Sequence, residues 1–245
     1  MKCFKFDYFD GYIIPEIDGV KVLVDTGCPI TVSAGSSLPS LGDIWMTPAT
    51  ELLNPQMMAG FSREELEFEV LLGRNYLGIA PFMVDWDERT ICFESYDEPE
   101  GDQINFKVVM AGASTEAKVN DKDVKLIIDT GAKISFLGHE RFSESPVIGE
   151  VKDYHLSSGH FTAPLISAEF SYGSINLNLT AGRLDNELFD QLKMVSIDGI
   201  LGNDIYDYYS KVWYDFPGER MILMNRRPTP LSNERVSETV RFNLD

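Results

Sequence analysis

The stretch Val20-Lys21-Val22-Leu23-Val24-Asp25-Thr26-Gly27 recurs as Val124-Lys125-Leu126-Ile127-Ile128-Asp129-Thr130-Gly131 in the second half of this 245-residue chain. Each copy consists of Val-Lys, three apolar residues and Asp-Thr-Gly. A single Asp-Thr-Gly needs no special explanation, because Asp and Gly favour the turns that follow strands. Two copies after similar apolar segments rich in β-branched residues predict two related halves, each of which ends a strand with a carboxylate.

The similarity of the halves continues downstream of both copies. Thr31 and Ser135 occupy the same position relative to Asp-Thr-Gly, and Leu71-Leu72-Gly73 corresponds to Ile200-Leu201-Gly202. Short strands joined by turn residues flank these segments, with hairpin turns expected at Asp18-Gly19, Asp87-Glu88, Asp121-Lys122 and Phe216–Glu219. Such strands at regular spacing, with little helical periodicity, predict an all-β architecture.

The boundary between the halves is predicted from composition. Tyr96–Asp102 is acidic and contains a proline and a glycine, which is typical of a linker. We therefore expect an N-terminal lobe over residues 1–97 and a C-terminal lobe over residues 98–245. The additional length of the second half contains an alternating, hairpin-like stretch around Ser157–His160.

A few short helices and one terminal strand complete the expected elements. Helices are predicted at Thr50–Met58, directly after Gly73, and at Asn186–Lys193. The alternating pattern of Thr239–Leu244 predicts a strand, which we expect to lie beside Lys2–Phe9 beneath both lobes.

Composition narrows the classes of function. The chain is 44% hydrophobic and 24% charged, as in ordinary globular proteins, and has no apolar run long enough to cross a bilayer. Its net charge of −18 argues against nucleic acid or an anionic membrane as a partner. Three widely spaced cysteines predict reduced thiols rather than a disulfide framework, and the N-terminal residues lack a signal-peptide pattern, so a cytoplasmic location is expected.

The repeated phrases resemble the signature of aspartic peptidases of the pepsin and retropepsin kind. The shared pattern is three hydrophobic residues, Asp-Thr-Gly, a Thr or Ser four residues later, and then two hydrophobic residues and Gly, all twice in one chain. The resemblance extends over about residues 12–95 and 104–224. It implies a bilobal, all-β pepsin-like barrel fold with two pseudo-symmetric retropepsin-like lobes and the active site between them.

The resemblance also implies an activity and the residues that carry it. Asp25 and Asp129 would form a dyad that shares one proton and activates a water for attack on a peptide bond. Thr26 and Thr130 would bond across to the opposite lobe, and two glycines, Gly27 and Gly131, would let backbone N–H groups approach the carboxylates. The expected reaction is endopeptidase cleavage of a peptide or protein substrate by a monomer, without a metal or other cofactor.

Two positions depart from the family pattern. Cys28 and Ala132 follow the two Asp-Thr-Gly phrases, where Ser, Thr or Ala is common. Ala cannot donate a hydrogen bond to the carboxylate and a thiol donates weakly, so we expect a dyad that titrates higher than pepsin's, with activity nearer neutral pH. Pro29 and Lys133 at the next position are also unusual.

The hairpin around Ser157–His160 is a candidate flap that closes over substrate. Tyr154, Ser158, Gly159 and His160 are the residues expected to serve it. An ordinary surface hairpin is an almost equally good interpretation of the same pattern. On the flap interpretation, the flap belongs to the second lobe, the reverse of the arrangement in pepsin.

Other reactive side chains point less clearly to function. Exposed loop positions explain His139, His155 and His160 better than zinc binding does, because their spacing fits no common site. A packed thiol explains Cys28 better than a nucleophile does. The three tryptophans are expected in the core or between the lobes; they are Trp45, Trp86 and Trp213.

Two other functions remain open at this level. A pepsin-like fold can bind a peptide or a protein partner without cutting it, since fold does not establish function. A self-processing or regulatory peptidase with one dedicated partner is the other alternative.

Overall fold

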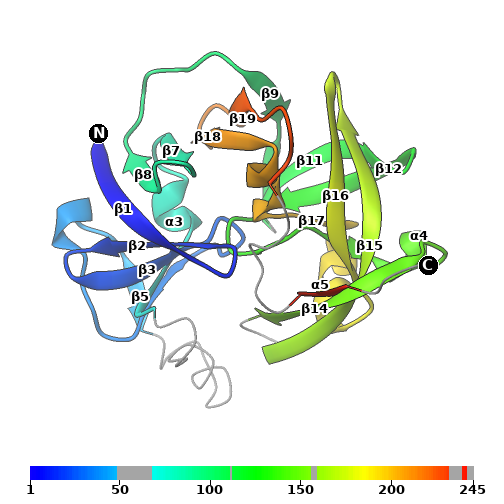
Figure 1. Ribbon diagram of the computed structural model, residues 1–245. Helices are drawn as coiled ribbons and strands as arrows, with labels where there is room; N and C mark the ends of the chain where they lie inside the picture. The colour runs from blue at the N-terminus through cyan, green and yellow to red at the C-terminus, as the bar shows by residue number, and fades with distance from the viewer. Residues whose placement is uncertain (49–67, 111, 156–158, 232–238, 242–245) are drawn as a thin grey trace.

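The computed structural model describes residues 1–48, 68–110, 112–155, 159–231 and 239–241. Strands dominate it, helices are few and short, and the strands form two sheets, so the prediction of an all-β, bilobal fold is confirmed. Figure 1 shows the first half of the chain, in blue and cyan, on one side and the green and yellow strands of the second half on the other.

The first sheet has the strand order β5-β4-β6-β3-β2-β1-β8-β7-β18-β19-β9. Its strands are β1 (Lys2–Phe9), β2 (Tyr12–Ile17), β3 (Val20–Val24), β4 (Thr31–Ser33), β5 (Met46–Pro48), β6 (Val70–Leu72), β7 (Phe82–Asp85), β8 (Thr90–Phe93), β9 (Asp102–Asn105), β18 (Tyr209–Asp215) and β19 (Arg220–Arg226).

The second sheet has the order β10-β11-β12-β17-β13-β16-β15-β14-β20. Its strands are β10 (Lys107–Val109), β11 (Gly112–Val119), β12 (Lys122–Ile128), β13 (Phe136–Gly138), β14 (Val147–His155), β15 (Gly159–Tyr172), β16 (Ile175–Leu184), β17 (Gly199–Leu201) and β20 (Thr239–Arg241). The described helical segments are η1 (Pro39–Leu41), α3 (Arg74–Leu77), α4 (His139–Phe142), α5 (Glu187–Met194) and η2 (Asn203–Asp207).

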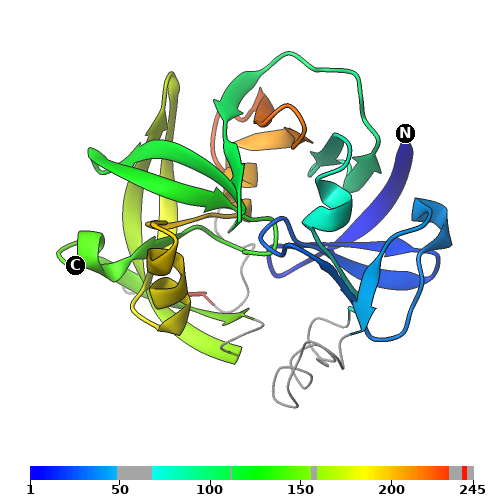
Figure 2. The same cartoon turned by 180° about the vertical axis from the view of Figure 1, so that it is seen from behind.

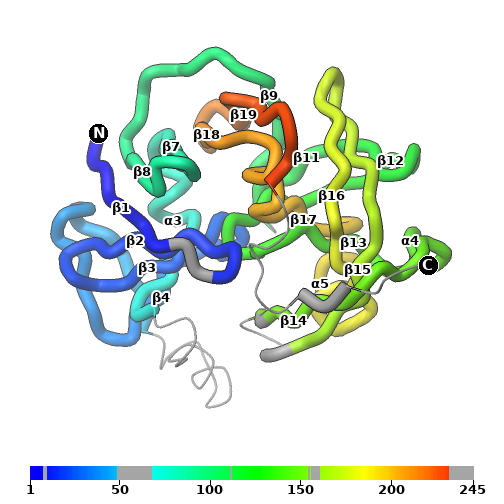
Figure 3. The backbone as a smooth tube through the Cα atoms, viewed as in Figure 1, coloured from blue at the N-terminus to red at the C-terminus, as the bar shows by residue number. Residues whose placement is uncertain are grey.

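The first sheet contains strands from both halves of the chain. β18 pairs antiparallel with β7, and β19 in turn pairs with β9. Figure 3 shows the orange and red β18 and β19 returning to the first half of the chain, where β18 lies beside β7. Because this sheet draws on both halves, the boundary expected between residues 97 and 98 stays a prediction.

Both halves repeat one local arrangement of strands. β3 runs parallel to β6, with β4 antiparallel on the other side of β6. In the same way, β12 runs parallel to β17, and β13 lies antiparallel to β17. The apolar residues that precede each Asp-Thr-Gly are buried in these parallel pairs, as near-continuous apolar runs predict. The repeated sequence therefore folds into a repeated structure.

Aromatic side chains from both halves of the chain pack together in one hydrophobic core. Phe82 of β7 stacks on Tyr214 of β18 with ring centroids 4.8 Å apart, and Trp86 stacks on Tyr206 at 4.7 Å. Trp86 and Trp213 are buried as predicted. The prediction is wrong for Trp45, whose side chain is 69% exposed.

The helix predictions are confirmed where the structure describes them. α3 begins directly after Gly73, and α5 occupies Glu187–Met194 with the Asn186 side chain as its N-terminal cap. Leu188 and Phe189 bury α5 against the second sheet, which Figure 2 shows from behind. The helix expected at Thr50–Met58 lies outside the described residues.

Two strand-level predictions are wrong. The terminal strand β20 pairs with β14 of the second sheet, not with β1. In β1, Lys2–Lys5 pair with β8 and Phe6–Phe9 pair with β2. The β11–β12 turn is centred on Asn120 and Asp121, which both adopt positive φ, rather than on Asp121 and Lys122.

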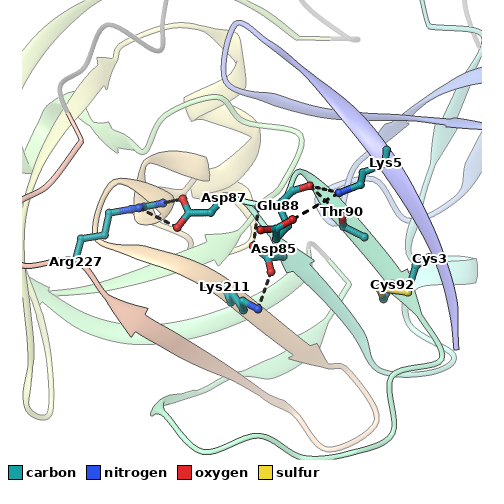
Figure 4. A network of polar contacts seen from close by, with 9 residues as sticks. All are labelled: Cys3, Lys5, Asp85, Asp87, Glu88, Thr90, Cys92, Lys211 and Arg227. Atoms are coloured by element: carbon teal, nitrogen blue, oxygen red, sulfur yellow. Dashed lines mark hydrogen bonds and ion pairs between the residues drawn. A yellow bond between two sulfur atoms is a disulfide. The ribbon is translucent and has the colours of Figure 1, made fainter.

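The expectation of three reduced thiols is also wrong. Cys3 of β1 and Cys92 of β8 form a disulfide, because the antiparallel register places them directly opposite each other. Figure 4 shows this bond beside a polar network at the β7–β8 turn, in which Lys211 pairs with Asp85 at 2.7 Å. The thiol argument for a reducing compartment is therefore lost, and the cytoplasmic location stays a prediction.

Candidate active site

Asp25 and Asp129 meet at the interface between the two halves. The backbone N–H of Gly27 donates to Oδ1 of Asp129 at 3.1 Å, although the two residues belong to different lobes. Gly131 N–H donates to the same oxygen at 2.8 Å, and Cys28 N–H donates to Oδ1 of Asp25 at 2.8 Å. Folding thus brings both predicted aspartates to one place and surrounds them with backbone donors.

Parallel strand pairing fixes where each aspartate stands. Asp25 N–H donates to the carbonyl of Leu72 at 3.1 Å, and Asp129 N–H donates to the carbonyl of Leu201 at 3.0 Å. Each bond continues the ladder of the parallel pair by one residue beyond its end. The backbone of each aspartate is therefore held by the buried strand next to it.

The two glycines of the motifs allow the carboxyl groups to approach. A Cβ atom on Gly27 would lie 2.5 Å from Cγ of Asp129, and one on Gly131 would lie 2.5 Å from Cγ of Asp25. Any side chain at either position would overlap the carboxyl group of the opposite half. Close approach of the two acids therefore requires glycine at both places.

The two threonines of the motifs exchange hydrogen bonds across the interface. Thr26 N–H donates to Oγ1 of Thr130 at 3.0 Å, and Thr130 N–H donates to Oγ1 of Thr26 at 2.9 Å. Each hydroxyl then donates to a carbonyl of the opposite half, Ile128 for Thr26 and Val24 for Thr130. Both threonines are buried, so the exchange fixes the separation of the halves beneath the aspartates.

A second pair of hydroxyls supports the strands next to the motifs. Thr31 accepts from Gly73 N–H at 3.1 Å and donates to the Asn75 side chain at 2.7 Å. In the other half, Ser135 accepts from Gly202 N–H at 3.1 Å and donates to the Asp204 side chain at 2.7 Å. The correspondence of Thr31 and Ser135 in the sequence is thus a correspondence of structural role.

The electrostatic environment favours a proton on Asp25. Burial of its carboxyl group raises the pKa of Asp25 well above its usual value, and the negative charge of Asp129 and a hydrogen bond with its side chain raise it further. The N–H groups of Cys28 and Gly27 act in the opposite direction but do not reverse the effect. How the pair titrates in comparison with pepsin's dyad, and the pH of greatest activity, both stay predictions.

Cys28 is a protonated thiol at neutral pH. Burial, followed by the charge of Asp25, raises the pKa of Cys28 to about 12. Its Sγ donates to the carbonyl of Ile30 at 3.2 Å, not to a carboxylate. The structure therefore agrees with a packed thiol rather than a nucleophile.

The candidate flap is a real hairpin. β14 and β15 pair antiparallel up to Tyr154 opposite His160 and His155 opposite Gly159. Ser158, and the side chains of Tyr154 and His160, lie outside what the structure describes. Whether the hairpin closes over a substrate stays a prediction.

His155 is a residue that sequence reasoning misjudged. It ends β14 and is partly buried, and its pKa is lowered by burial, while the charge of Asp129 acts to raise it. The expectation of exposed loop histidines is thus wrong for His155, and also for the partly buried His139, which begins α4. Strand alternation could have found His155, because it shares a face with the buried Val151 and Asp153.

Further contacts between the halves have no signature in the sequence. Lys133 is 3% exposed and pairs with Asp10 of the β1–β2 turn at 3.0 Å. The Asn203 side chain donates to the carbonyls of Gly11 and Thr130 at 2.9 and 2.8 Å. The first hairpin of the chain is therefore fixed against the second Asp-Thr-Gly loop.

Within the described ranges, no helix has the length and apolar character needed to span a bilayer. The same ranges contain no group of three or more His, Cys, Asp or Glu side chains arranged to hold a metal ion.

Comparison with known proteins finds a similarity in structure but none in sequence. No protein-family model matches the chain, and no curated protein is similar to it in sequence. Among solved structures, it is similar to a retropepsin-like aspartic protease from Rickettsia conorii, with 17% identity and a TM-score of 0.34. That match covers 52% of this chain and 95% of the other protein.

Proposed function

We propose that this chain is an aspartic endopeptidase whose catalytic residues are Asp25 and Asp129. The observation that supports this most strongly is that each carboxyl group lies against the glycine of the opposite half. Two carboxyl groups that are held close together do not both ionise at moderate pH, so we expect the pair to hold one proton. A singly protonated pair carries an acid and a base at one place.

The chemistry follows from this pairing. The ionised carboxylate takes a proton from a water bound between the acids, and the water attacks the carbonyl carbon of a peptide. The protonated carboxyl group donates a hydrogen bond to the oxyanion that develops. The proton then passes to the leaving nitrogen as the C–N bond breaks. Protein and peptide chains in extended conformation are the substrates of the proposal.

Replacement of either acid tests the proposal. Asp25→Asn and Asp129→Asn should each lower kcat for cleavage of an unfolded protein by about three orders of magnitude or more, because an amide neither accepts the proton nor shares one. The matched control is Asp121→Asn, which removes one exposed carboxylate from the β11–β12 turn. A statine-containing peptide, which mimics the tetrahedral intermediate, should inhibit the unmodified protein.

The assay between pH 3 and 8 separates the alternatives. Cleavage that both substitutions abolish supports the peptidase. Tight binding of the statine peptide without cleavage contradicts it and supports a silent peptide-binding module. Cleavage that survives both substitutions contradicts the roles of Asp25 and Asp129.

A further inference from the structure

Arg74 links the dyad to the other half of the molecule. It begins α3, and its backbone N–H donates to the carbonyl of Cys28 at 2.8 Å, next to the first Asp-Thr-Gly. Its guanidinium group reaches the second half, where it donates to the carbonyls of Val109 and Met110 at 3.3 and 3.2 Å. These carbonyls lie at the end of β10, the edge strand of the second sheet. Arg74 thus links the loop of the first Asp-Thr-Gly, through its backbone, to the end of the strand that precedes the second motif, through its side chain.

Among the described residues, the positive charge of Arg74 has no adjacent counterion. Its Nε is buried and finds no acceptor within the same ranges. The ion pairs of the described chain do not include it, whereas Lys133 beside the second motif is paired with Asp10. A partly buried cation without an anionic partner is costly, even where carbonyls accept its hydrogen bonds, so charges further away become important.

At neutral pH, the negative charges that act on Arg74 belong to the dyad. Burial lowers the pKa of Arg74; Cys28 would oppose that effect if it were ionised, and the carboxylates of Asp25 and Asp129 oppose it. Coulomb attraction is mutual, so the guanidinium group favours the ionised forms of the same groups. It accordingly acts to lower the pKa of the Cys28 thiol.

The corresponding position of the second half carries no charge. Asn203 follows Gly202 as Arg74 follows Gly73, and it also reaches the opposite half, where it donates to the carbonyl of Gly11. Its side chain is neutral. Arg74 and Asn203 thus both donate hydrogen bonds to carbonyls of the opposite half. Only Arg74 adds a positive charge.

The other titratable groups near the dyad do not replace this charge. His155 of β14 and Tyr214 of β18 both interact with the charge of Asp129. Burial lowers the pKa of His155 and raises that of Tyr214, so both are neutral at neutral pH. Cys28 is a neutral thiol, and Lys133 is neutralised by its ion pair. Among the described groups that interact with the charges of the dyad, Arg74 is thus a cation that no ion pair neutralises.

We propose that Arg74 is a positioning residue of the dyad: it fixes the β10–β11 hairpin against the first Asp-Thr-Gly loop and provides the positive charge that favours the singly ionised pair. Its importance for peptide cleavage rests on the proposed function. Its effect on the ionisation of Asp25 and Asp129 does not, and can be measured in a protein that cuts nothing.

Titration of the two carboxyl groups provides the test. In protein labelled with ¹³C at the aspartate carboxyl carbons, the resonances of Asp25 and Asp129 are assigned by Asp→Asn substitution and followed from pH 2 to 9. Arg74→Gln removes the charge but keeps hydrogen-bond donors, so the titration midpoints of the pair should move up by about 0.5 to 1 in pH. Arg74→Lys keeps the charge and should leave the midpoints within about 0.3 in pH.

The control removes one cation from the surface of the same lobe. Arg89 is exposed in the β7–β8 turn, and Arg89→Gln should leave the midpoints unmoved. Near-UV circular dichroism establishes that each variant is folded. Should Arg74→Gln not fold, Arg74→Lys decides, because midpoints that move by about 0.5 in pH or more despite the retained charge overturn the proposal.

The outcomes separate this inference from the proposed function. Midpoints that do not move in folded Arg74→Gln overturn the role of Arg74, whether or not the protein cleaves peptides. Midpoints that move up in a protein without activity support Arg74 and contradict the peptidase. In an active protein, the pH profile of kcat/KM should move up by the same amount as the midpoints, and an unmoved profile contradicts the role in cleavage.

Discussion

At the scale of single residues, the site depends on carboxyl groups that are expensive to ionise together. Asp25 and Asp129 each lie against the glycine of the opposite motif, so removal from water and mutual repulsion act on the same pair. The backbone donors of Gly27 and Cys28 limit this effect without cancelling it. The ionised state of the pair is therefore disfavoured in the folded protein, a cost to folding that the proposed catalytic role would explain.

Asp25→Asn should therefore stabilise the protein in a way that depends on pH. Between the unfolded pKa of Asp25, about 3.9, and its raised folded pKa, the native state holds a proton that the unfolded chain has lost, so stability falls as pH rises. An amide cannot ionise and lacks this fall. The gain in the free energy of unfolding should be near zero at pH 3.5 and should grow towards pH 7, by about 1.4 kcal/mol for each pH unit crossed between the two pKa values.

Urea unfolding at pH 3.5, 5 and 7 measures this gain. The exposed-site variant Asp121→Asn should show no such trend. A stability difference that is the same at all three pH values would show that the Asp25 carboxyl group is not strained by ionisation.

At the scale of elements, four short strands place the motifs and the two threonines lock them. The parallel pairs β3–β6 and β12–β17 hold the aspartates, and the exchange between Thr26 and Thr130 joins the pairs. All four hydrogen bonds of the exchange are between groups of different halves. The loss of one hydroxyl therefore removes the partner of a backbone N–H and of a carbonyl in the opposite half.

Thr26→Val and Thr130→Val should each lower the free energy of unfolding by about 1 to 3 kcal/mol, because valine keeps the shape but leaves a buried N–H unpaired. Thr26→Ser and Thr130→Ser keep the hydroxyl and should cost less than the valine variants. Denaturant unfolding measures both pairs. If the valine variants are as stable as the serine variants, the hydrogen bonds of the two threonine hydroxyls do not contribute to the stability of the contact between the halves.

At the scale of the whole molecule, both acids come from one chain. The first sheet continues from the N-terminal strands through β7 to β18 and β19, so the second half of the sequence completes a sheet that the first half begins. This shared sheet and the core between the halves keep the two motifs in contact without a second copy of the protein.

We expect specific activity to be independent of protein concentration. Dilution from micromolar to nanomolar should leave kcat unchanged, because no association step is needed to assemble the dyad. Sedimentation velocity over the same range establishes the state of association. A loss of specific activity on dilution that coincides with dissociation of a dimer would contradict catalysis by the monomer.

Much of the fold and site could be predicted because their determinants are local and repeated. Strand alternation, turn residues and the duplicated phrase predict the all-β halves and both motifs, and the helix expected at Asn186–Lys193 corresponds to α5. Contacts that depend on register could not be predicted. Cys3 and Cys92 become neighbours only when β1 pairs with β8, and a one-residue change of register would separate them.

The sequence by itself determined that two Asp-Thr-Gly motifs end two buried strands in two related halves, because strand-forming runs, glycine and aspartate act over a few residues. Tertiary structure alone decided that the acids meet, that β20 pairs with β14, and that Arg74 extends to the opposite half. The physical reason is that side-chain proximity across a fold depends on how sheets pack and pair, and no local pattern in the chain records that distance.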